Sequence, residues 1–134
     1  MDLLAPLFVQ VAMTFVLAIY MGYCRYNAVK AHEVKVRDIA LRQPNWPEKA
    51  TKVGNAFHNQ IETPILFYLL VVLLILTKQG DTVQLYLAWC YIAARLVHLT
   101  LHITSNRVFY RFLAFVISII ILMIMWGRFM ATQL

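Results

Sequence analysis

The stretch NAFHNQIETPILFYLLVVLLILT, residues 55–77, joins a polar half to an uninterrupted apolar half. Its apolar part, residues 63–77, carries no charged side chain. A membrane span needs roughly 20 mostly apolar residues, so this run is too short to cross alone. The sequence therefore predicts one long helix, residues 47–78, whose first half is polar on one side and whose second half lies in lipid.

The start of this helix is marked by the run Asn45-Trp46-Pro47-Glu48. Asparagine is a common capping residue, proline fits the first turn, and an acid is favoured at the positive end of the helix dipole. Pro64, inside the same helix, lacks the backbone N–H that would continue the hydrogen-bond ladder. We therefore expect the helix to bend near Pro64.

Three more apolar segments complete the predicted fold, at residues 3–28, 82–104 and 108–130. Two short turns, Lys78-Gln79-Gly80-Asp81 and Thr104-Ser105-Asn106-Arg107, force the helices on either side to run antiparallel. The sequence thus predicts a single domain, residues 1–134: an all-α integral membrane protein with four transmembrane helices in an up-down bundle.

Composition supports a membrane location. Of the 134 residues, 62% are hydrophobic and 13% are charged, whereas soluble domains carry about 25% charged residues. The net charge of +6 does not indicate a nucleic-acid-binding protein, because the basic residues flank apolar spans instead of forming one soluble face. Cys24 and Cys90 both lie in apolar segments, so we expect no disulfide framework.

Basic residues also predict the orientation. The first connection and its borders hold most of them: Arg25, Lys30, Lys35, Arg37, Arg42, Lys49 and Lys52. The third connection carries Arg107, with Arg111 close behind, whereas the second has Lys78 alone. The positive-inside rule then places connections one and three in the cytoplasm and both termini outside.

Polar side chains cluster on the second predicted helix just before its apolar run. Asn55, Asn59 and Glu62 stand at i, i+4 and i+7, which places them on one face. His58 lies on a neighbouring line. An acid so near the hydrocarbon is costly unless it faces the bundle interior and has a partner.

The third predicted helix offers that partner. Arg95, His98 and His102 stand at i, i+3 and i+7, and Asn106 extends the same line. Antiparallel neighbours would bring Arg95 and Glu62 to similar depth, and the planar guanidinium matches a carboxylate well. We therefore expect an ion pair between Glu62 and Arg95.

This cluster has several possible roles. It can fasten helices together, with the asparagines as interhelical hydrogen-bonding groups. His98 and His102 at i, i+4 can ligate a metal, with Glu62 or His58 completing the set, but this spacing alone is weak evidence. Haem between His98 and His58 is a further alternative. We expect no metal and favour satisfied histidines near the membrane interface.

The run around Asn59 also resembles a known family. The second helix of the MAPEG family, the membrane-associated proteins of eicosanoid and glutathione metabolism, carries the pattern Arg-Ala-x-x-Asn-x-x-Glu followed shortly by proline. Ala56, Asn59, Glu62 and Pro64 fit it, as do four spans with a long basic first connection. The segment Ala94-Arg95-Leu96-Val97-His98, with His102 and Asn106-Arg107 after it, looks like the bacterial branch, which implies a bacterial inner membrane.

The resemblance implies an assembly and a chemistry. Family members form homotrimers, and the glutathione-dependent ones bind glutathione between neighbouring subunits near the cytoplasmic side. Their activities include conjugation of glutathione to electrophiles and reduction of lipid hydroperoxides. Other members bind lipid and present it to a partner without catalysis.

Site residues follow from the same resemblance. The implied glutathione-binding residues are Arg25, Asn55, Asn59, Glu62, Arg95, His98 and His102. Arg107 or Arg111 would activate the thiol, because adjacent positive charge stabilises a thiolate. Asn55 departs from the family, since it stands where glutathione-binding members have arginine. His98 and His102 depart as well, since they stand where the leukotriene-forming synthase has tyrosines.

Two functions remain open from these residues. The first is a membrane glutathione S-transferase or peroxidase that takes apolar electrophiles from the bilayer, with glutathione as co-substrate; the retained Asn59 and Glu62 favour it. The alternative is a non-catalytic lipid-binding or accessory protein of the same fold, which the missing arginine at Asn55 favours.

Overall fold

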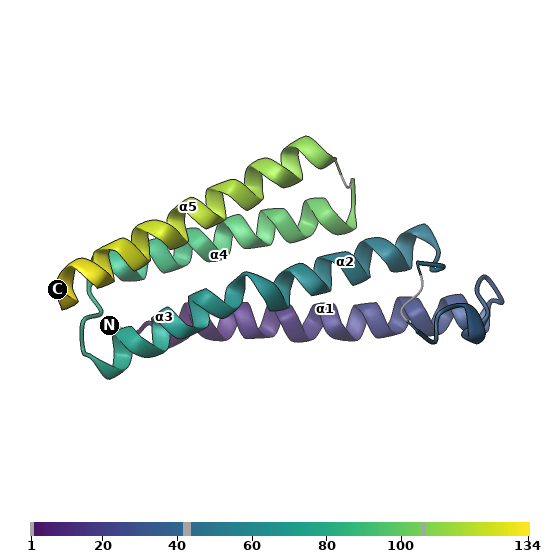
Figure 1. Ribbon diagram of the computed structural model, residues 1–134, viewed down its shortest axis with the longest axis horizontal. Helices are drawn as coiled ribbons and strands as arrows, with labels where there is room; N and C mark the ends of the chain where they lie inside the picture. Colours follow the sequence, from purple (N-terminus) through teal and green to yellow (C-terminus); the bar gives the residue numbers. More distant parts are fainter. Residues whose placement is uncertain (1, 42–43, 106) are drawn as a thin grey trace.

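The structure, a computed structural model, describes residues 2–41, 44–105 and 107–134. Within these ranges the regular elements are helical (Figure 1). Their order is α1 (Leu4–Lys30), a short 3-10 helix at Val36–Asp38, α2 (Glu48–Glu62), α3 (Pro64–Leu76), α4 (Thr82–Ile103) and α5 (Val108–Gln133). The ends of α1, of the α2–α3 pair, of α4 and of α5 lie within a few residues of the predicted ones, and the 3-10 helix was not predicted.

The helices form an up-down bundle. Both termini and the turn between α3 and α4 lie at one end, and the connections that follow α1 and α4 lie at the other (Figure 1). We call this second end the basic end, because most lysines and arginines of the chain lie in or beside its two connections. At the basic end, α1 and α2 extend past the ends of α4 and α5 (Figure 1).

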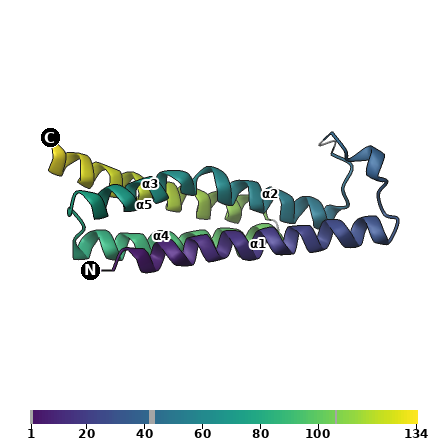
Figure 2. The same cartoon turned by 90° about the horizontal axis from the view of Figure 1, so that it is seen from below.

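Seen from below, the bundle has two layers. α1 and α4 lie side by side in one layer, while α2, α3 and α5 make up the other (Figure 2). The strongest packing is between α4 and α5 and between α1 and α2, with α2 also against α4. This arrangement brings the polar faces of α2 and α4 together inside the bundle.

Among the described residues, three helical stretches are long and apolar enough to cross a membrane: α1, the combined α2–α3 from Glu48 to Leu76, and α5. The remaining helix, α4, has 22 residues and is about 33 Å long, enough for a hydrocarbon core of about 30 Å. It carries polar side chains, among them Arg95, His98 and His102, and it buries these three inside the bundle.

The predicted bend falls at Pro64. The long helix is divided there into α2 and α3, with Thr63 between them in helical conformation (φ −66°, ψ −41°). Because Pro64 has no N–H to donate, α3 starts anew and the N–H of Leu66 donates to the carbonyl of Thr63 at 3.2 Å. The axis changes direction at this point (Figure 1).

Two apolar clusters form the core. The one nearer the termini is centred on Phe67 of α3 and Tyr91 of α4, whose stacked rings lie 4.6 Å apart. The one nearer the basic end joins Leu17 of α1 to Ala50 and Val53 of α2. Small residues on α2 let the helices approach closely there, while most bulky apolar side chains elsewhere face outwards, as a lipid environment requires.

Candidate functional site at the basic end

Arg95 is the most unusual buried residue of the bundle. Its side chain is 0% exposed, and burying a cation is costly unless it is paired and hydrogen-bonded. Its Nη2 donates to the carbonyl and the Oδ1 of Asn59, at 3.3 and 3.1 Å, and to Oε1 of Gln60 at 3.2 Å. Oxygens from α2 therefore solvate Nη2 without a carboxylate, while Nε and Nη1 of Arg95 are buried with no hydrogen-bond partner among the described residues.

The expected ion pair between Glu62 and Arg95 is wrong for this chain. Glu62 is exposed on α2, and Arg95 donates to Asn59 and Gln60 instead. Glu62 is the last residue of α2 and is not among the residues that this helix buries. The neutral amides of Asn59 and Gln60, which precede Glu62 on α2, take the place expected for the acid beside Arg95.

A hydrogen-bonded relay extends this contact to α1. Nε2 of Gln10, which is 0% exposed, donates to Oε1 of Gln60 at 2.8 Å. We call Gln10, Gln60, Arg95 and Asn59 the amide relay, because three amide side chains connect α1 through α2 to the arginine on α4. Neither glutamine was predicted from the sequence, although Gln10 is a polar residue inside a charge-free span.

The amide relay fixes the orientation of the Asn59 side chain. Because Oδ1 of Asn59 accepts from Arg95, its amide is oriented and Nδ2 is left to donate elsewhere. Asn59 also lines a cavity of about 190 Å³. Its other lining residues are His98, Val108, Arg111, Phe112 and Phe115. It brings together three of the predicted site residues, one each from α2, α4 and α5.

The two histidines lie beside this cavity. The rings of His98 and His102 meet edge to face with centroids 5.5 Å apart, and the ring of Phe115 lies 5.9 Å from that of His98. Both histidines are buried. Within the described residues, no three histidine, cysteine, aspartate or glutamate side chains are grouped so as to hold a metal ion.

A second polar cavity lies under the first connection. It has a volume of about 450 Å³, and its walls include Arg25 of α1, Trp46, and Gly54, Asn55 and His58 of α2. The guanidinium carbon of Arg25 lies 5.1 Å from the centre of the Trp46 ring, a cation–π contact. A β-carbon at Gly54 would lie 3.1 Å from Nη2 of Arg25, so glycine permits this close approach.

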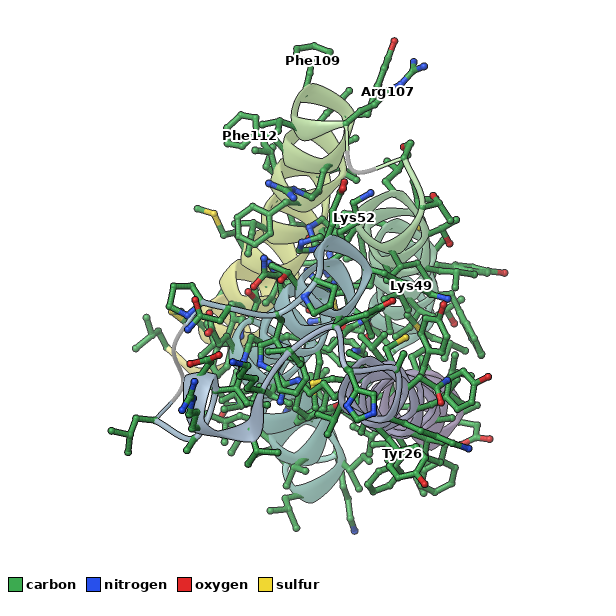
Figure 3. All side chains as sticks on the ribbon, turned by 90° about the vertical axis from the view of Figure 1, so that its right-hand side faces the viewer. Tyr26, Lys49, Lys52, Arg107, Phe109 and Phe112 are labelled. Carbon is green, nitrogen blue, oxygen red and sulfur yellow. The ribbon has the colours of Figure 1, made fainter. Side chains whose placement is uncertain are left out.

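The predicted site residues therefore fall into two groups in one chain. Asn59, His98 and Arg111 line the smaller cavity, whereas Arg25 and Asn55 line the larger one. Glu62 and Arg107 are exposed, and Figure 3 shows Arg107 projecting from the start of α5. Asn106 lies outside the described residues.

Fold and site together define a small helical membrane protein whose polar groups are gathered at one end of the bundle. A model of the MAPEG family matches residues 3–131, nearly the whole chain. The chain therefore belongs to the MAPEG family, as its motif on α2 indicated. No curated protein and no solved structure matches it.

Proposed function

We propose that this MAPEG protein is a glutathione-dependent enzyme that joins glutathione to apolar electrophiles drawn from the bilayer. The observation that carries the proposal is the cavity lined by Asn59, His98 and Arg111. It combines an amide donor, an imidazole and a guanidinium at the basic end, beside apolar helix faces. Glutathione carries two carboxylates and a thiol, so it suits a polar cavity with a fixed cation.

In the proposed mechanism, Arg111 stabilises the thiolate of bound glutathione. The thiol gives its proton to water, and the positive guanidinium lowers the free energy of the anion that remains. The thiolate sulfur then forms a C–S bond with the electrophilic carbon, and the leaving group departs with the electron pair of its bond. In the peroxidase variant, the thiolate attacks the terminal oxygen of the hydroperoxide, the O–O bond breaks, and the lipid alkoxide takes up a proton and leaves as the alcohol. The thiol of a second glutathione then attacks the sulfur of the resulting sulfenic acid, which forms the disulfide and releases water.

We further propose that the site is completed in a homotrimer in a bacterial inner membrane, with the basic end in the cytoplasm. Family members are generally trimeric, and the two cavities of one chain divide the candidate residues between them. A neighbouring copy would bring Arg25 and Asn55 to the cavity that holds Arg111. In this proposal Glu62, which is exposed on α2, also faces the neighbouring subunit or the ligand. Arg107 and His102 border the site. Arg95 acts on the ligand indirectly, through Asn59.

The test is calorimetric titration of glutathione into the purified protein in detergent, with the ultraviolet absorbance of the thiolate recorded in parallel. Arg111→Gln is expected to weaken binding by about tenfold or more, since hydrogen bonds to charged groups contribute about 1.5–3 kcal/mol. The same variant should remove the thiolate absorbance. Lys78→Gln, at the opposite end of the bundle, is the control and should bind like the wild type.

Arg107→Gln separates the two candidate thiol-activating arginines. If it abolishes the thiolate signal while Arg111→Gln keeps it, the role assigned to Arg111 is wrong. If the wild type binds no glutathione at millimolar concentration while folded, the enzyme proposal is wrong.

The second candidate is a non-catalytic lipid-binding or accessory protein, and it has one observation in its favour. Asn55, which lines the larger cavity, brings no positive charge to the position where glutathione-binding relatives have arginine. Lipid that co-purifies with the wild type and is lost in Arg25→Gln, with no glutathione binding, would support this function.

A further inference from the structure

An apolar groove runs along the layer that α1 and α4 form together. It has a volume of about 380 Å³, and none of its lining residues borders either polar cavity of the candidate site. Its walls include Ala12, Val16 and Tyr20 of α1 and Leu96, Leu99 and Ile103 of α4. α1 and α4 lie side by side (Figure 2), and Val16 and Leu96 are 66% and 51% exposed, so the groove opens outwards to lipid.

The groove spans one leaflet in depth. From Val9 to Tyr20, its limits on α1, the helix rises about 16 Å, close to half of a hydrocarbon core about 30 Å thick. Its α4 wall consists of residues from the last two turns, which lie toward the basic end. The groove therefore lies in the leaflet at the basic end, and its depth suits an acyl chain.

A cation stands at the mouth of the groove. The ammonium of Lys49 lies 5.9 Å from the centre of the Tyr20 ring, and viewed from the basic end Lys49 appears between α1 and α4 (Figure 3). In the described part of the chain Lys49 has no carboxylate partner, whereas Lys52 on the same helix pairs with Glu48 at 3.1 Å. Lys49 is thus available for an anion from the bilayer.

We propose that the groove binds an anionic phospholipid, with its acyl chain along Ala12 and Leu99 and its phosphate on Lys49. Charge favours this occupant over a second copy of the chain, because the chain carries a net charge of +6. A helix from another copy would fill the apolar part but leave Lys49 without a counter-charge. Tyrosine is suited to the headgroup level at the end of such a site.

Native mass spectrometry of the detergent-solubilised protein tests this proposal, with phosphatidylglycerol and phosphatidylcholine of identical acyl chains as probes. Phosphatidylglycerol should bind saturably and more tightly than phosphatidylcholine. Lys49→Gln should weaken phosphatidylglycerol binding about fivefold and leave phosphatidylcholine unchanged, as expected for one lysine at an anionic surface. Lys52→Gln is the matched control and should change neither lipid.

Ala12→Phe tests the apolar part independently, because the larger side chain fills the groove from its open side. Both phospholipids should then bind more weakly. Equal phosphatidylglycerol affinity in the wild type and Lys49→Gln would overturn the proposal. So would an Ala12→Phe protein with unchanged lipid binding and fewer chains per complex, which would assign the groove to contact between copies.

Discussion

At the scale of single residues, the structure makes Arg95 dependent on neutral amides. A buried guanidinium without a carboxylate keeps its charge only if oxygens replace its hydration. Asn59 and Gln60 supply those oxygens to Nη2 from adjacent positions on α2, and Gln10 holds the amide of Gln60 in place. The orientation of Asn59 in the candidate site is therefore set by residues that no ligand needs to touch.

Gln60→Leu should destabilise the protein by about 3 kcal/mol, because it removes an acceptor from a buried cation and leaves the Gln10 amide unpaired. In an Arg95→Met background the same change should cost about 1 kcal/mol, since one neutral donor alone is then affected. The free energy of unfolding in a denaturing-detergent titration measures both. The control is Gln84→Leu, which removes a buried neutral hydrogen bond to the carbonyl of Met125 at 3.1 Å. It should lower the free energy of unfolding equally in both backgrounds. If Gln60→Leu also lowered the free energy of unfolding equally in both backgrounds, Gln60 and Arg95 would not be energetically coupled.

The sequence predicted which helices carry Asn59 and Arg95, but it predicted Glu62 as the partner of Arg95, which is wrong. Helical spacing placed Asn59 and Glu62 on one face and Arg95 at matching depth, all of which depends on local geometry. It did not determine how far α2 is rotated about its axis, which depends on packing against α1. A buried Gln10 opposite Gln60 fixes that rotation, so Glu62 faces outwards and Gln60 inwards.

At the scale of elements, two helices end in the same way without glycine. After α3, Lys78 has φ 56°, its N–H donates to Ile75, and the N–H of Gln79 donates to Leu74. After α1, His32 has φ 59°, its N–H donates to Val29, and the N–H of Glu33 donates to Ala28. These are Schellman motifs, which usually have glycine at the left-handed position. The sequence predicted the turn Lys78-Gln79-Gly80-Asp81, and the left-handed residue within it is Lys78, not Gly80.

Lys78→Gly should therefore stabilise the protein by about 1 kcal/mol, because glycine adopts the left-handed conformation without the steric cost of a β-carbon. The exposed side chain of Lys78 gives up no packing. Thermal unfolding in detergent micelles, followed by circular dichroism, measures the change. Thr77→Gly, one residue earlier at φ −87°, is the control and should lower the unfolding temperature. A loss of stability in both variants would show that the strain at Lys78 is relieved in some other way.

At the scale of the whole molecule, the candidate residues line two separate cavities of one bundle. Arg25 and Asn55 border the cavity under the first connection, and Asn59 and Arg111 border the cavity between α2, α4 and α5. Sequence spacing cannot reveal this division, because it depends on which helices pack together. In a closed ring of identical copies, the first cavity of one chain can face the second cavity of the next.

Mixing two defective chains tests whether the site is shared. If Arg25 and Arg111 act from different copies, Arg25→Gln chains and Arg111→Gln chains should each bind glutathione poorly alone. Co-expressed as mixed trimers, they should recover about a third of the wild-type sites, since one of the three neighbouring pairs in such a ring joins an intact Arg25 to an intact Arg111. Calorimetric stoichiometry, on complexes carrying two different affinity tags, measures this fraction. The control is a complex that contains only one of the two variants, expressed with both affinity tags. Absence of recovery in verified mixed complexes would place both arginines in the same subunit's site, because only then does every site contain a defect.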